Sequence, residues 1–113
     1  MGIFNIFKKK TEAEKNTDDR ELIASNAEAV KAMTVLASDD EVKAELTRLE
    51  NDIRYLIPLT EERAINADKK IRNLIGDLKI ELVKDKNDEK AAAKLQAAVK
   101  ELKIAVAERR AMI

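Results

Sequence analysis

The sequence lacks cysteine and histidine, and each absence removes a class of chemistry. Without cysteine, neither a disulfide framework nor thiolate chemistry is available. Without histidine, the commonest general base at neutral pH is missing, and imidazole zinc sites, histidine-dependent triads and the Glu-x-x-His di-iron motif are excluded. We therefore expect a protein that is not an enzyme and that holds no metal or other cofactor.

Glycine, proline and aromatic residues are also scarce, at two, one and three residues in a chain of 113. The chain is 45% hydrophobic and 39% charged, a balance that argues against disorder and, with abundant Ala, Glu, Lys, Leu and Arg, favours long helices. This length fits a single domain with its own core. No apolar run is long enough for a membrane-spanning helix. We expect a cytoplasmic protein, with a membrane surface as one place of action.

The hydrophobic spacing predicts an all-α bundle of four segments at about 19–37, 39–57, 60–85 and 88–112. Apolar residues recur at steps of three and four, the pattern of a helix that buries one face against its neighbours. The predicted buried positions are Ile23, Asn26, Val30, Met33 and Ala37; Val42, Leu46, Leu49, Ile53 and Leu56; Ala64, Asp68, Ile71, Ile75, Leu78 and Leu82; and Ala92, Leu95, Val99, Leu102, Val106, Arg109 and Ile113.

Capping residues and Pro58 set the predicted helix boundaries. We expect Asp18, Ser38, Thr60 and either Asn87 or Asp88 to begin the four helices. The last two helices have nearly equal lengths and are predicted to form a long antiparallel hairpin. The joints at Ser38 and Pro58 are short, so each is a reversal or a kink, and the second and third helices could form one bent rod.

We also make structural predictions for two single residues, Gly76 and Tyr55. Gly76 lies inside the third predicted helix, where it is a tolerated weakness, a break, or a point of close approach to an alanine row on the fourth helix, Ala91, Ala98 and Ala105. Tyr55 is expected to pack at the edge of the core with its hydroxyl in water.

Charge is unevenly distributed, although the formal net charge is zero. Residues 18–57 carry a net charge of −5 and residues 58–113 carry +3, so we expect an acidic first half to dock on a basic second half. The basic residues of the second half also raise nucleic-acid binding as an alternative. Acidic residues lie between them and the chain has few aromatic side chains for stacking, so we regard that partner as the weaker reading.

The first ten residues form the main candidate binding segment. Both phenylalanines lie there, in an apolar group that precedes three lysines: Ile3, Phe4, Ile6 and Phe7, followed by Lys8, Lys9 and Lys10. Large apolar side chains beside lysines suit an anionic membrane interface. Two alternatives remain open, a protein partner or self-association, and packing of the segment against its own bundle. Because these lysines follow the apolar group, the segment does not resemble a secretory signal peptide.

We therefore divide the chain into two regions, an amphipathic segment with a polar linker at 1–17 and the helical bundle at 18–113. The opening MGIF, followed by an aromatic and basic residues, resembles the start of the PspA and ESCRT-III-like membrane-remodelling family. The resemblance covers about seven residues, and the rest of the chain is about half as long as that family needs. The resemblance implies that the protein binds a membrane surface.

The segment from Asp85 to Glu89 resembles the start of a calcium-binding EF-hand loop. Lys90 replaces the required glycine and Gln96 replaces the bidentate glutamate, so a helix turn explains the segment better. The sequence therefore predicts a non-catalytic helical interaction or scaffold protein, attached peripherally through residues 3–10. A soluble homo-oligomeric coiled-coil assembly or regulatory protein is the first alternative, and a nucleic-acid-binding helical protein is the second. No small-molecule substrate is indicated.

Overall fold

The computed structural model describes residues 12–84 and 89–112, and nearly all of these residues are helical. The four helices are α2 (Glu12–Leu36), α3 (Asp40–Arg54), α4 (Glu62–Leu82) and α5 (Glu89–Arg110). The described residues contain no strand. The predicted all-α bundle of four segments is confirmed.

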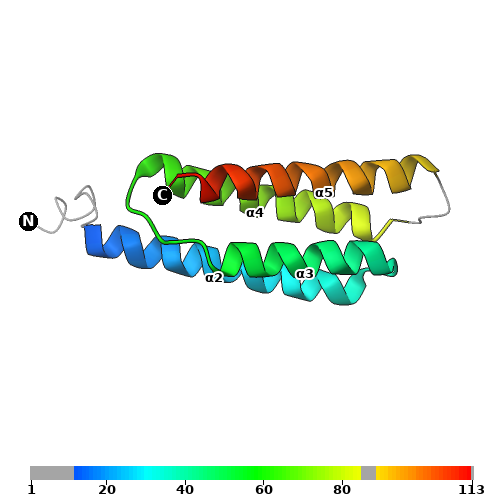
Figure 1. The fold of residues 1–113 in the computed structure, drawn as a ribbon, viewed down its shortest axis with the longest axis horizontal. Coiled ribbons are helices and arrows are strands. Elements are labelled where there is room, and N and C mark those ends of the chain that lie inside the picture. Colours follow the sequence, from blue (N-terminus) through cyan, green and yellow to red (C-terminus); the bar gives the residue numbers. More distant parts are fainter. Residues whose placement is uncertain (1–11, 85–88, 113) are drawn as a thin grey trace, which may run out of the picture.

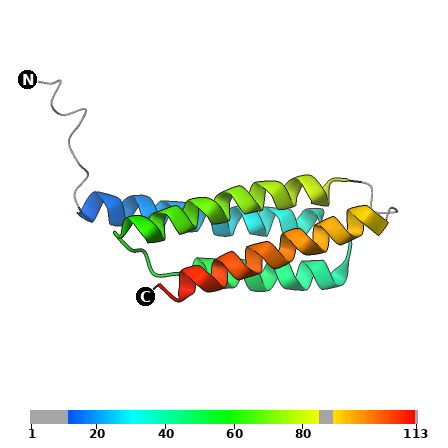
Figure 2. The same cartoon turned by 90° about the horizontal axis from the view of Figure 1, so that it is seen from above.

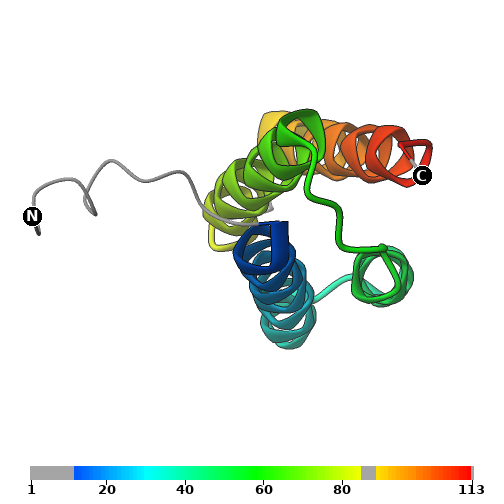
Figure 3. The same ribbon diagram turned by 90° about the vertical axis from the view of Figure 1, so that its left-hand side faces the viewer.

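The helices lie in an arc in the order α3, α2, α4, α5, which is seen end-on in Figure 3. The pairs α2 with α3, α4 with α5, and α2 with α4 pack closely, whereas α3 and α5 approach each other least. Figures 1 and 2 show that successive helices run in opposite directions along the long axis. Two pairs that lie beside each other, α2 with α4 and α3 with α5, therefore run in the same direction.

The first helix begins earlier than the sequence pattern predicts. We expected a polar linker up to Thr17 and a helix that starts at Asp18 or Asp19, but α2 begins at Glu12. Asp19 is 1% exposed inside α2. The error arose because Asp18 and Asp19 were interpreted as a helix start, whereas the Asp19 carboxylate binds Leu59 and Arg109 from inside α2.

The N-caps of α3 and α4 lie one residue after the predicted caps. Asp39, not Ser38, caps α3, and its Oδ1 accepts a hydrogen bond of 2.8 Å from the amide of Glu41. The N-cap of α4 is Glu61, not Thr60, and its side chain makes no capping hydrogen bond. Both joints reverse the chain, so the bent-rod alternative for the second and third helices is wrong. The predicted turn at 85–88 lies outside the described residues.

The hydrophobic core contains no aromatic side chain in the described part of the chain. Nearly every predicted buried position in the described ranges is buried, including Asn26, Asp68 and Arg109, whereas Ile113 lies outside those ranges. Ala92 is exposed, however, and the buried face of α5 begins at Leu95. The buried hydrophobic residues are Ile23, Ala27, Val30, Met33, Ala37, Val42, Leu46, Leu49, Ile53, Leu56, Ala64, Ile71, Ile75, Leu78, Leu82, Leu95, Val99, Leu102, Ala105 and Val106.

The structure corrects the predictions for two single residues, Gly76 and Tyr55. A Cβ added at Gly76 would meet nothing within 4 Å, so this glycine is a tolerated weakness and not a point of close helix approach. Ala105 is buried, but it does not lie within 4 Å of that added Cβ. Tyr55 is 80% exposed at the end of α3, so it does not pack at the edge of the core.

Candidate functional site

The predicted binding residues Ile3, Phe4, Ile6, Phe7, Lys8, Lys9 and Lys10 lie outside the described residues. The chain enters the described bundle at the start of α2, at the same end as the segment between α3 and α4 (Figure 1). Two features of the bundle itself stand out as candidate sites. One is a buried charged cluster at that end, and the other is a surface groove between α3 and α5.

The buried cluster consists of Asp19, Asn26, Asp68 and Arg109, which come from α2, α4 and α5. Asp68 and Arg109 occupy positions of the apolar faces of α4 and α5, so the heptad spacing directs both side chains into the core. Arg109 is 0% exposed and is the largest fully buried side chain of the described residues. Its length allows it to reach across the bundle from α5 to α2, two helices that do not pack directly on each other.

The guanidinium of Arg109 contacts both carboxylates. Its Nε donates to Asp68 Oδ2 at 3.2 Å, and its Nη2 donates to Asp19 Oδ2 at 3.2 Å. Asn26 adds a third link, because its Nδ2 donates to the backbone carbonyl of Asp68 at 3.0 Å. These bonds connect α2, α4 and α5 through a single charged centre.

The same cluster fixes the segment that joins α3 to α4. Arg109 Nη2 donates to the carbonyl of Ile57 at 2.7 Å, and the amide of Leu59 donates to Asp19 Oδ2 at 2.8 Å. Both backbone groups flank Pro58, whose ring prevents a continuous helix at this point. Asn16 Nδ2 also donates to the Pro58 carbonyl, at 3.4 Å. The segment is thereby held on the first turns of α2.

The cluster places two carboxylates around one guanidinium in the core. Burial, together with a hydrogen bond to Asp19, raises the pKa of Asp68 to about 7 against the opposing effect of Arg109. Within the described residues, Asp19 Oδ1 and Arg109 Nη1 are buried without a hydrogen-bond partner. The arrangement can therefore exchange a proton near neutral pH, and it binds together four parts of the chain.

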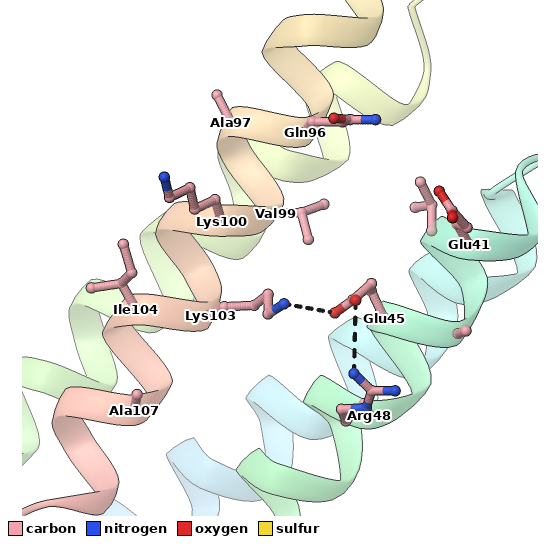
Figure 4. A pocket seen from close by; sticks show the side chains of 12 residues that line it. Glu41, Glu45, Arg48, Gln96, Ala97, Val99, Lys100, Lys103, Ile104 and Ala107 are labelled. Carbon is pink, nitrogen blue, oxygen red and sulfur yellow. Dashed lines mark ion pairs between the residues drawn. The ribbon is translucent and has the colours of Figure 1, made fainter.

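The groove between α3 and α5 has a volume of about 950 Å³ and is drawn in Figure 4. Val42 of α3 and Val99 of α5 line its buried part, and Lys103 crosses it to Glu45, with 3.1 Å between Nζ and Oε2. Glu45 Oε1 also lies 3.8 Å from Nη1 of Arg48 on the same helix. Acidic side chains thus predominate on the α3 side and basic side chains on the α5 side, in line with the expected attraction between the two halves of the chain.

Sequence reasoning found the members of the buried cluster one by one but did not bring them together. Asn26, Asp68 and Arg109 were predicted to face the core, yet Asp19 was read as part of a helix start and Arg109 also as part of a basic surface. The signal that could have joined them is the combination of an acidic and a basic residue at core positions of successive helices. A buried charge requires a partner, and these were the available ones.

In the described ranges, no helix is long and apolar enough to cross a membrane, and no group of three or more acidic residues could hold a metal ion. Comparison with known proteins adds no relative, because no family model, curated protein or solved structure matches the chain. The resemblance of the first residues to the PspA and ESCRT-III-like family therefore stays a prediction from sequence.

Proposed function

We propose that the protein is a non-catalytic helical interaction module that attaches peripherally to an anionic membrane surface through its first ten residues. The observation that carries this proposal is the position of the aromatic residues. Both phenylalanines and a run of three lysines precede a bundle in which no aromatic side chain is buried among the described residues. The apolar faces of the four described helices pack against one another. The side chains best suited to a lipid interface are concentrated in the segment that precedes these helices.

The energetics favour a weak and reversible attachment. Each large apolar side chain transferred from water contributes about 1.5–3 kcal/mol before the cost of ordering the segment. Each lysine near an anionic surface adds about 1 kcal/mol. Attachment of this kind would respond to the lipid charge and to salt.

Vesicle co-sedimentation tests the proposal with the full chain. We expect binding to vesicles that contain phosphatidylserine, little binding to vesicles of phosphatidylcholine alone, and loss of binding in the Phe4→Ser/Phe7→Ser double variant. A matched control is the double variant Val35→Ser/Val83→Ser, which changes two exposed apolar residues of the bundle. Equal sedimentation of the wild type and the Phe4/Phe7 variant would contradict the proposal.

A further inference from the structure

The face formed by α3 and α5 has a charge pattern that is complementary to itself. Lys103 pairs with Glu45 across the groove, and Nη1 of Arg110 lies 3.8 Å from Oδ1 of Asp52. The two pairs have the same separation along the sequence, so the helices run in parallel and in constant register. The α3 edge is acidic at Glu45 and Asp52, and the α5 edge is basic at the same levels.

Several side chains of this face are directed away from the molecule's own core. Figure 4 shows Lys100 and Ile104 pointing away from α3, and Ile104 is 49% exposed. Alanines lie beside them on both helices, at Ala44, Ala97 and Ala107. Small side chains on neighbouring helices allow another helical surface to come close, and the exposed isoleucine provides apolar area to bury.

We propose that this α3–α5 face is a self-association surface, on which a second copy of the chain packs with its α5 over α3 and its α3 over α5. Such a dimer has a two-fold axis parallel to the helices. It is independent of the proposed membrane attachment, because it uses only residues of the bundle.

The charges favour this dimer over the alternative in which α3 packs on α3 and α5 packs on α5. Rotation about a two-fold axis parallel to the helices does not shift residues along the helix direction, but it places α5 of one copy opposite α3 of the other. Glu45 of each copy therefore meets Lys103 of the other. An axis that crosses the helices would instead lay the acidic edge of α3 on the same edge of the other copy. In the first arrangement the two pairs form a square of alternating charges, whereas in the second like charges oppose one another.

The size of the face indicates that association is weak. The α3 helix has 15 residues, so the face is about 22 Å long and lies at the small end of specific protein interfaces. Self-association should therefore be measured at protein concentrations from tens to hundreds of micromolar. It should weaken as salt rises, because these edge charges are partly exposed.

Sedimentation velocity with two single charge reversals of the full chain tests the arrangement. Glu45→Lys leaves both positions of the pair positive, and Lys103→Glu leaves both negative. Each variant alone should sediment as a monomer, because every contact across the axis becomes repulsive. An equimolar mixture of the two variants should recover a dimer, because each lysine then meets a glutamate of the other copy. The wild type should dimerise.

Two exposed residues of the same helices outside the groove provide matched controls, Lys43→Glu and Glu101→Lys, which should dimerise as the wild type does. Thermal unfolding checks that each variant is folded. A wild type that stays monomeric throughout the concentration range would overturn the proposal. So would single reversals that dimerise normally, or a mixture of the two folded variants that remains monomeric.

Discussion

At the scale of single residues, Arg109 has the most consequential position in the bundle. It pairs with two buried carboxyl groups and also donates a hydrogen bond to the carbonyl of Ile57. Ion pairs in a core need not stabilise a protein relative to apolar residues, but removal of one partner leaves an uncompensated charge. Loss of one charged member of the cluster would therefore leave a buried charge without its partner.

We predict that Arg109→Met lowers the free energy of unfolding by about 3–5 kcal/mol at pH 7.5, because Asp19 and Asp68 lose their shared cation. Urea unfolding followed by circular dichroism measures the change. The matched control is Arg110→Met, since the Arg110 side chain is 60% exposed and its pairing with Asp52 is long. That control should change stability by less than about 1 kcal/mol. Similar losses in both variants would mean that the buried cluster has no special role.

The pH dependence of stability follows from the raised pKa of Asp68. Burial lifts this pKa from 3.8 to about 7 in the folded chain, so between those values the folded state holds a proton that the unfolded state has released. Raising the pH from about 4 to about 7 must then reduce this group's contribution to stability, which levels off above 7.

Urea unfolding at a series of pH values measures this slope, with Asp68→Asn as the reference. The asparagine cannot titrate, so the difference in unfolding free energy between wild type and variant isolates the proton of Asp68. We expect the wild type to lose stability relative to Asp68→Asn as the pH rises from about 4 to about 7. A constant difference between pH 5 and pH 8 would show that Asp68 does not titrate in that window.

At the scale of helices, Gly76 is a position where another residue would give a more stable α4. It lies inside α4, and nothing within 4 Å would obstruct a Cβ. We predict that Gly76→Ala raises the free energy of unfolding by about 0.5–1 kcal/mol, because alanine loses less conformational freedom in a helix. Chemical unfolding measures the gain. A loss of stability would indicate that an unidentified contact requires the glycine.

The helices also show which parts of a fold can be predicted from sequence. Periodic burial is a local property, so Val42, Leu46 and Leu49 were correctly assigned to one face of α3. Helix starts were less accurate, because Asp18, Ser38 and Thr60 can all cap a helix and tertiary contacts decide which residue does so. For α3, the cap moved by one residue to Asp39.

At the scale of the whole molecule, the order of the helices was not predictable from periodicity. The spacing of apolar residues says that each helix has a buried face, but it does not say which neighbour that face meets. The bonds from Asp19 and Arg109 to Leu59 and Ile57 hold the crossing from α3 to α4 in place. These contacts join residues far apart in the sequence, so only the folded arrangement reveals them.

We propose that the four described helices are stable as a bundle without the first ten residues, which act in attachment. The most direct measurement is the free energy of unfolding of the full chain beside that of a chain lacking residues 1–10. We predict that the two values agree within about 0.5 kcal/mol, as for changes away from a core. A loss of several kcal/mol on deletion, of the size that removal of a buried phenylalanine produces, would contradict the claim.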